Sequence, residues 1–209
     1  GLIIVAIVAG MFISVNLLSK KSVKTNTTKP DRSKTTNTTP VTKNVLKISA
    51  MGDMLAHDTI NINATTETSY NYVHYFQNVS KLYAGSDITF CNQEVLSSGE
   101  NFGISGYPIF NAPKEFARDL SKTGCNVINL ANNHMADKGT AAISETIDLW
   151  TGLNPLAFAG ANKSTADQNT VRYFTKNDIK VAFLAFADFN NNKSIPSYAV
   201  NIYHDETLL

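Results

Sequence analysis

A polar segment near the N-terminus, residues 19–44, most constrains what this chain can fold into. It holds eight threonines, two prolines and seven basic residues against the single acid Asp31, and only Val23 and Val41 are apolar. Such a segment buries too little apolar surface to offset the entropy lost on ordering, so we expect a flexible linker. A compact fold is therefore confined to residues 45–209, and the apolar leader at residues 1–18 is a separate unit.

The leader has the composition of a membrane segment. It reads GLIIVAIVAGMFISVNLL, carries no ionisable side chain and has only Ser14 and Asn16 as polar residues. Eighteen helical residues span roughly 27 Å, close to the ~30 Å hydrocarbon core of a bilayer. We predict an uncleaved single-pass transmembrane helix that contacts membrane lipid, and a cleaved signal peptide is the alternative. Lys20 and Lys21 directly after it would favour a cytoplasmic linker.

Charge is distributed unevenly along the chain. The formal net charge is +1, but the linker carries +6, and residues 45–209 hold eleven basic against sixteen acidic groups, a net −5. Because a basic surface is the minimum requirement for nucleic-acid binding, we predict that the globular part binds no nucleic acid. The content of 43% hydrophobic and 10% aromatic residues is sufficient for a core and excludes disorder of the whole chain.

From Val45 onward, short apolar runs alternate with segments of helical periodicity, which is typical of an α/β (α+β layered) fold. The run VAFLAFA at 181–187 is apolar on both faces, so we expect a central strand, paired as a hairpin with 171–174. The remaining strands are predicted at 45–51, 87–91, 125–130 and 155–159, and the helices at 70–83, 113–124 and 138–153.

Polar residues follow three of the predicted strands at their carboxyl ends. They are Gly52-Asp53, then Asn92-Gln93-Glu94, then Asn132-Asn133-His134. Because ligands bind outside the carboxyl ends of strands in open α/β sheets, we expect these loops to converge. Carboxylate, amide and imidazole groups suit Mn²⁺, Mg²⁺, Fe or Zn²⁺. Such a metal would activate water, and a neighbouring histidine could protonate a leaving group.

Each motif also has a purely structural interpretation. Gly-Asp after a strand is commonly a turn, and Asn133 could cap the following helix. His57 could be a further metal ligand, although we expect a surface histidine there. We expect Cys91 and Cys125 to be small buried residues, not a disulfide or a metal-binding pair. The joint occurrence of three polar strand ends favours a functional site over these alternatives.

The same motifs resemble the bacterial capsule synthesis proteins of the CapA/PgsA type. That family has Gly-Asp after the first strand, Asn-Leu-Glu after the second, and Ala-Asn-Asn-His-x-x-Asp-x-Gly before a helix containing Glu-Thr. The run Met51–Leu55, the triplet at 92–94, the run Leu130–Gly139 and Glu145-Thr146 are similar to it. The resemblance covers about residues 45–209. It implies a metallophosphoesterase-like αββα sandwich, of which this chain would be the N-terminal portion.

The resemblance also implies roles for individual residues. Asp53, Glu94 and Asn133 would be metal ligands, and His134 would be the catalytic acid or transition-state stabiliser. Asn92 and Asp137 would support these ligands. The complete protein would hold two divalent ions, with further histidines supplied beyond residue 209, so we expect the 209-residue chain alone to bind metal poorly.

The resemblance finally implies a function at the cell surface. The chain would be a single-pass membrane component of poly-γ-glutamate capsule biosynthesis or export, with its globular domain outside the cell. Its partners would be polyglutamate synthase or export subunits and an anionic polymer or phosphate ester. The alternatives are a metal-dependent phosphoesterase of the cell envelope and a non-catalytic surface domain.

Overall fold

The computed structural model describes residues 3–8 and 44–203. Strand β1 (Ile3–Val8) belongs to the predicted leader and lies parallel to a strand near the C-terminal end of the fold. The rest of the leader, the predicted linker up to residue 43, and His204 lie outside the described residues. Within the described ranges, no helix has the length and apolar character needed to cross a membrane. The transmembrane helix and the linker remain predictions.

Two sheets and a layer of helices make up the fold. A four-stranded parallel sheet has the order β2-β3-β4-β5, and a three-stranded sheet has the order β1-β7-β6, in which β6 is antiparallel to β7. The strands are β2 (Ile48–Met54), β3 (Ile88–Gln93), β4 (Val127–Asn129), β5 (Ala157–Ala159), β6 (Arg172–Lys176) and β7 (Ile179–Phe186). The helices are α1 (Asp58–Ala64), α2 (Val73–Phe76), α3 (Ser80–Tyr83), the 3₁₀ turn η1 (Glu100–Phe102), α4 (Lys114–Lys122), α5 (Gly139–Leu153) and α6 (Thr165–Gln168).

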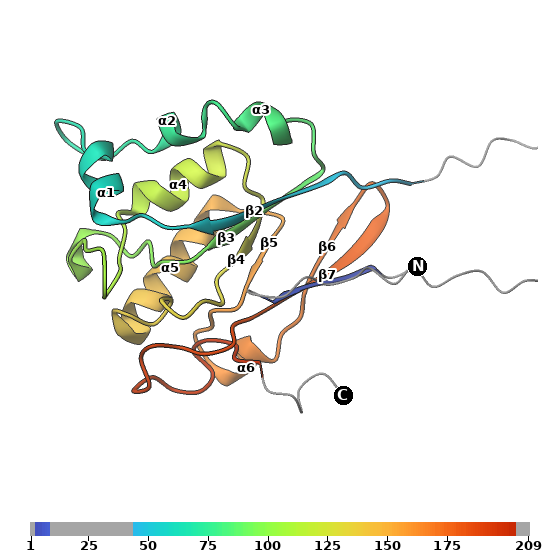
Figure 1. Ribbon diagram of the computed structural model, residues 1–209. Coiled ribbons are helices and arrows are strands. Elements are labelled where there is room, and N and C mark those ends of the chain that lie inside the picture. Colours follow the sequence, from blue (N-terminus) through green and yellow to red (C-terminus); the bar gives the residue numbers. More distant parts are fainter. Residues whose placement is uncertain (1–2, 9–43, 204–209) are drawn as a thin grey trace, which may run out of the picture.

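Successive side chains of the parallel strands point to opposite faces of the sheet, and each face has its own hydrophobic core. On β3, Cys91 faces the helices, whereas Phe90 faces the second sheet. Figure 1 shows α4 and α5 on one side of the parallel sheet and the β6–β7 hairpin on the other. The predicted α/β layers are therefore confirmed, and they are consistent with a metallophosphoesterase-like fold. The predicted hairpin is also confirmed, with β7 central in the second sheet.

One predicted helix is wrong in extent. The segment predicted as a single helix at 70–83 forms two short helices, α2 and α3. Tyr72 is fixed ahead of α2 because its backbone N–H donates to the buried carboxylate of Asp119 at 2.8 Å. Val79 is also exposed, so the periodic residues do not form one buried face. Helix α1, which was not predicted, begins after His57, whose ring caps it.

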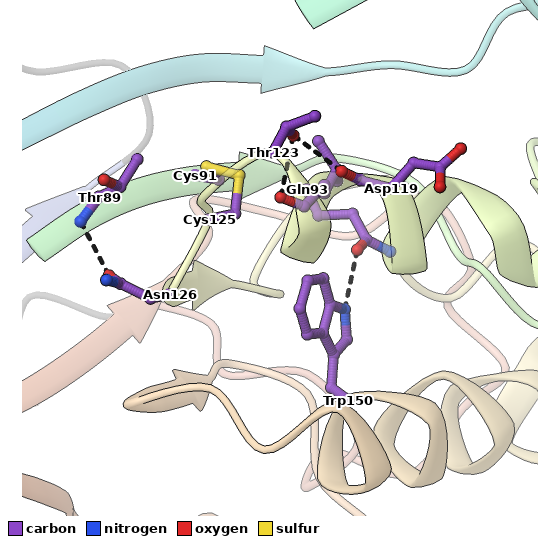
Figure 2. Close-up of a disulfide and its surroundings, with 9 residues drawn as sticks. Thr89, Cys91, Gln93, Asp119, Thr123, Cys125, Asn126 and Trp150 are labelled. Atoms are coloured by element: carbon purple, nitrogen blue, oxygen red, sulfur yellow. Dashed lines mark hydrogen bonds between the residues drawn. A yellow bond between two sulfur atoms is a disulfide. The ribbon is translucent and has the colours of Figure 1, made fainter. Parts of the chain in front are cut away.

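The expectation for the two cysteines is also wrong, because Cys91 and Cys125 form a disulfide (Figure 2). Val127 pairs with Phe90 in the parallel ladder, which brings the residues just before β4 beside the middle of β3. The two Cα atoms lie 5.7 Å apart, within the range that a disulfide requires. The bridge is buried on the helix side of the sheet.

Candidate functional site

The carboxyl ends of β2, β3 and β4 meet around the buried side chain of Asn92. Its Nδ2 donates to Asp53 Oδ1 at 2.5 Å, so β3 is joined to the end of β2. Its Oδ1 accepts hydrogen bonds from Asn129 at 2.6 Å and from Asn132 at 3.0 Å, so β3 is joined to β4. The three polar strand ends therefore converge, as the sequence led us to expect. Asn92 thus contacts Asp53, which the resemblance predicts as a metal ligand, and the supporting role of Asn92 stays a prediction.

An irregularity in β2 positions Asp53. The strand was expected to end at Gly52-Asp53, but it continues to Met54, and its register with β3 shifts between Met51 and Met54. An extra residue of this kind bends a strand and redirects a side chain. Asp53 is exposed at this bend, with its carboxylate held by Asn92.

Glu94 follows β3 directly and is half-buried beside other carboxylates. Burial raises the pKa of the Glu94 carboxyl, and the nearby Asp53 and Asp137 carboxylates raise it further, while His134 opposes them. The Glu94 carboxylate accepts no hydrogen bond within the described residues. Its oxygens are therefore available to an external cation or donor.

His134 is held by a neighbouring carboxylate and a phenyl ring. Its Nδ1 lies 2.7 Å from Asp137 Oδ2, and the side chains of the two residues are only 13% and 3% exposed. The same Asp137 oxygen accepts the backbone N–H of Phe110 at 2.7 Å, and the Phe110 ring meets the imidazole edge-on at 4.6 Å. Asp137 therefore orients the imidazole through Nδ1, and Nε2, which lies 3.5 Å from the Asn191 amide nitrogen, is the nitrogen that can exchange a proton with a ligand.

Asn133 does not cap the following helix. Helix α5 has Lys138 at its N-cap, and the Asn133 carbonyl accepts the backbone N–H of Asn191 at 3.0 Å. The Asn133 side-chain amide makes no hydrogen bond within residues 44–203, so its oxygen remains available as a ligand.

The sequence interpretation missed two asparagines that shape this site. Asn129 contacts Asn92 from the end of β4, and the Asn191 amide lies 3.2 Å from His134 Nδ1. Asn191 belongs to the asparagine run 190–192, which follows β7 after Ala187, Asp188 and Phe189. This is the same signal, polar residues after a strand, that identified the other three strand ends. Applied to β7, it would have found Asn191.

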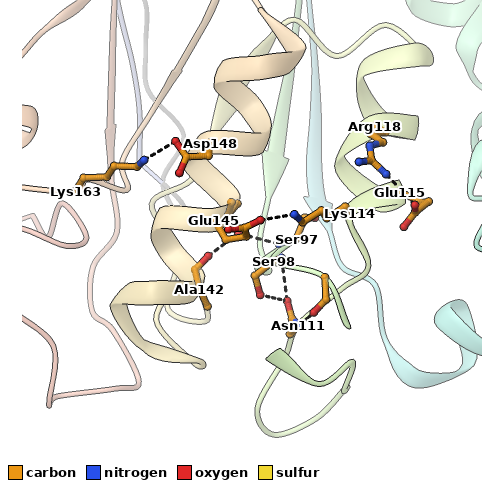
Figure 3. A network of polar contacts seen from close by, with 12 residues as sticks. Ser97, Ser98, Asn111, Lys114, Glu115, Arg118, Ala142, Glu145, Asp148 and Lys163 are labelled. Carbon is orange, nitrogen blue, oxygen red and sulfur yellow. Dashed lines mark hydrogen bonds and ion pairs between the residues drawn. The ribbon is translucent and has the colours of Figure 1, made fainter. Parts of the chain in front are cut away.

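A long loop after β3 is fastened to α5 and thereby carries Phe110 to His134. The Ser97 backbone N–H donates to Thr146 Oγ1 at 3.1 Å, and Lys114 forms an ion pair with Glu145 (Figure 3). Within the loop, Asn111 accepts a 2.6 Å hydrogen bond from the Ser98 hydroxyl. Glu145 and Thr146 of α5 therefore hold the loop that carries Phe110, and they support the site without facing it.

The residues brought together fit an oxygen-rich divalent ion site in part. The carboxylates of Asp53 and Glu94 and the free amide of Asn133 are suitable ligands, and the clustered negative charge is what a cation would neutralise. Within residues 44–203, however, no three His, Cys, Asp or Glu side chains are arranged closely enough to hold a metal alone. The other two histidines within residues 44–203 do not add to this set, because His74 is exposed on α2 and His57 caps α1.

Comparison with known proteins finds similarity to bacterial capsule synthesis proteins. Residues 47–206 match the family described as bacterial capsule synthesis protein PGA_cap. A curated relative, the capsule biosynthesis protein CapA of Bacillus anthracis, is 30% identical over 123 residues, which cover 57% of this chain. The chain spans about 30% of that relative's length.

Proposed function

The chain belongs to the family of bacterial capsule synthesis proteins, and from this membership we propose that it acts at the outer surface of the cell membrane in making or exporting poly-γ-glutamate. The polymer, the membrane anchor and the surface location are parts of this proposal. The matched CapA is much longer than the aligned region, so the activity of the whole protein is likewise proposed. Polyglutamate synthase or export subunits would be its partners in the membrane.

The disulfide supports the proposed location. Disulfides persist in secreted and surface proteins and are rare in the reducing cytosol. The bridge between Cys91 and Cys125 lies in the main core and links β3 to the start of β4. A domain that relies on such a bridge is best suited to folding outside the cytoplasm.

The convergence of Asp53, Glu94, Asn133 and His134 carries the proposal of a metallophosphoesterase-like site. A bound Mn²⁺, Zn²⁺, Fe or Mg²⁺ would supply Lewis-acid polarisation of a phosphoryl oxygen and lower the pKa of water. Asp53, Glu94 and Asn133 would hold it, together with ligands from outside the described residues. Asn92 keeps the Asp53 carboxylate in place.

His134 would perform the proton step. Asp137 accepts the hydrogen bond from Nδ1 and holds the ring in place, and Nε2 would donate the proton to the leaving-group oxygen. Phe110 excludes water from one side of the ring and fixes the Asp137 carboxylate through its N–H. The substrate would be an envelope phosphate ester connected with capsule assembly.

The test uses the full-length protein loaded with Mn²⁺ or Zn²⁺ and a generic phosphodiester. We expect metal-dependent hydrolysis that falls by at least about 10²-fold in Asp53→Ala and His134→Ala. Asp148→Asn, a carboxylate change on the exposed face of α5, is the control and should leave the rate unchanged.

Polymer production in cells separates catalysis from a structural role. We expect Asp53→Ala and His134→Ala to fail to restore capsule polymer to a strain lacking the protein. If both variants restore it and no metal co-purifies, the domain acts as a non-catalytic surface component.

A further inference from the structure

The loop that follows β7 reaches the candidate site from the second sheet. Its Asn191 backbone N–H donates to the Asn133 carbonyl at 3.0 Å, and its Asn192 side-chain N–H donates to the Ala136 carbonyl at 2.9 Å. The loop therefore holds the segment before α5 on both sides of His134 (Figure 1).

Hydrogen bonds within the loop fix its backbone. The side chain of Asn190, a residue that is only 7% exposed, accepts the backbone N–H of Asn192 at 3.0 Å. The Asn192 side chain accepts the backbone N–H of Ser194 at 2.9 Å. Asn190 and Asn192 thus use their amides to build the loop, whereas the Asn191 side chain does not. A side chain on a fixed backbone presents its polar group to a ligand at a reduced ordering cost.

The Asn191 amide lies on the face of the His134 ring. Its Nδ2 is 3.2 Å from Nδ1 and 3.5 Å from Nε2. The two ring nitrogens flank Cε1, so an atom in the ring plane at nearly equal distances from both would overlap Cε1. The amide nitrogen is therefore above the ring. An N–H on an aromatic face is a weak hydrogen bond, which leaves the amide able to bind a stronger acceptor.

The Asn191 amide has hydrogen-bonding capacity that the described residues do not use. Within residues 44–203, its Nδ2 contacts only the His134 ring, and its Oδ1 accepts no hydrogen bond. The carboxylate next to the ring, Asp137, is 3% exposed and is already bound to His134 Nδ1 and to the Phe110 N–H. The Asn191 N–H is therefore available to a ligand that approaches His134 Nε2.

We propose that the Asn191 amide contacts the substrate, donating to a non-bridging oxygen of the phosphoryl group whose leaving-group oxygen receives the proton from His134. Because the amide lies above the ring and Nε2 lies at its edge, the two groups would reach different oxygens of one phosphoryl group. A neutral donor suits this place, since the metal that Asp53 and Glu94 would hold balances the phosphoryl charge. The contact positions the substrate and breaks no bond. The inference rests on the proposed function of the same site.

The experiment measures phosphate binding and does not require turnover. The full-length protein is loaded with Mn²⁺ and titrated with inorganic phosphate, while NMR follows the phosphorus line width, which bound Mn²⁺ increases. We expect the wild-type protein to bind phosphate and Asn191→Ala to weaken that binding about tenfold, the effect of losing one hydrogen bond to a charged group. Asn191→Asp replaces the donor by a carboxylate of the same shape and should weaken binding at least as much.

A double variant separates a substrate contact from support of the imidazole ring. His134→Ala removes the ring, so an effect that acts only through the ring would disappear in that background, whereas a direct contact would persist. Asn191→Ala should therefore weaken phosphate binding about tenfold in His134→Ala as well. The substitution keeps the backbone N–H that binds the Asn133 carbonyl, so the loop stays attached. Asn63→Ala removes an exposed amide from α1 and should leave phosphate binding unchanged.

Three results would overturn the proposed contact. They are a wild-type protein that binds no phosphate, an Asn191→Ala affinity within about twofold of wild type, and an effect of Asn191→Ala that vanishes in His134→Ala.

Turnover gives an independent result. If the metal-loaded protein hydrolyses a phosphodiester, Asn191→Ala should raise KM about tenfold with kcat within about twofold, because uniform binding is lost. If phosphate binding depends on Asn191 but the wild-type protein shows no turnover, the proposed phosphoesterase activity fails while the contact stands. If the protein is active and Asn191→Ala changes neither binding nor KM, only the contact fails.

Discussion

The core between the helices and the parallel sheet differs from the core between the two sheets. The first contains the large side chains Trp150 and Tyr72 and the buried disulfide. In the second, the side chains that the structure describes include the alanines 131, 157, 159, 185 and 187. The helix-side core also carries a covalent cross-link, whereas five of the ten described buried residues of the second core are alanine and its largest side chains are Phe90 and Phe183. The candidate site lies at the strand ends, where the two cores meet.

The largest effect is expected for Trp150→Ala. Trp150 is fully buried, and its Nε1–H donates to Gln93 Oε1 at 2.8 Å (Figure 2). The substitution leaves a cavity and an unsatisfied buried amide, so we expect the free energy of unfolding to fall by about 5 kcal/mol. Phe183→Ala in the second core should lower it by about 3 kcal/mol, because it leaves a cavity beside the Phe90 ring but breaks no side-chain hydrogen bond. Urea denaturation measures both, and equal losses would contradict the contrast between the cores.

Removal of the disulfide is expected to have the next largest effect. The cysteines are 34 positions apart, and a closed loop of this length contributes about 3–4 kcal/mol in the chain-entropy account. The double variant Cys91→Ala, Cys125→Ala should lose that amount. A reducing agent should lower the melting temperature of the wild-type protein and leave that of the double variant unchanged. A wild-type protein insensitive to reductant would show that packing alone maintains the helix-side core.

A glycine at the border of the cores should have an intermediate effect. Gly160 has φ +110°, and a Cβ there would lie 2.4 Å from the Ala131 backbone nitrogen. Gly160→Ala should therefore lower the free energy of unfolding by about 1–3 kcal/mol. Gly152→Ala is the control, because it lies in α5 with no atom within 4 Å of its added Cβ, and it should be stabilising by about 0.5–1 kcal/mol. Destabilisation of similar size at both positions would refute the close approach of the chain after β5 to the chain after β4.

The sequence predicted the elements whose signal is local and periodic. Ile143, Ile147 and Trp150 are spaced as a helical stripe, and all three are buried in α5. The polar strand ends could also be predicted. Polar side chains such as Asn-Asn-His directly after a buried strand are costly unless they bind a ligand or form hydrogen bonds. These local signals identified the layers and three of the strand ends that form the site.

The features that were missed depend on contacts between distant segments. The disulfide follows from the register of β3 with β4, and no spacing along the chain encodes that register. Phe110 and Asn191 reach His134 from two loops far apart in the sequence. Tyr72 was assigned to a helix because its periodicity fits one, whereas its N–H is bound by Asp119, 47 residues away. Tertiary hydrogen bonding overrides local pattern at such positions.

The smallest effect is expected for a substitution of Glu94, which should raise the stability of the fold instead of lowering it. The pKa of the Glu94 carboxyl is raised by burial and by the Asp53 and Asp137 carboxylates, so its ionisation is less favourable in the folded protein than in the unfolded chain. The folded state then binds more protons than the unfolded state as Glu94 titrates, and stability falls as the pH rises through that range. Glu94→Gln removes this charge and should raise the melting temperature of the metal-free protein at neutral pH. The rise should stay below about 4 °C, the shift that ~1 kcal/mol produces in a domain of this size.

The pH dependence distinguishes electrostatic relief from improved packing. Below about pH 3, where the carboxyl is protonated in both states, the wild-type protein and Glu94→Gln should melt at the same temperature. Asp148→Asn, at an exposed carboxylate paired with Lys163, should show no such gain at neutral pH. A gain for Glu94→Gln that persists at low pH would assign the effect to packing. A gain that vanishes there would show that the strand ends keep a clustered negative charge at the expense of stability, as expected of groups positioned to bind a cation.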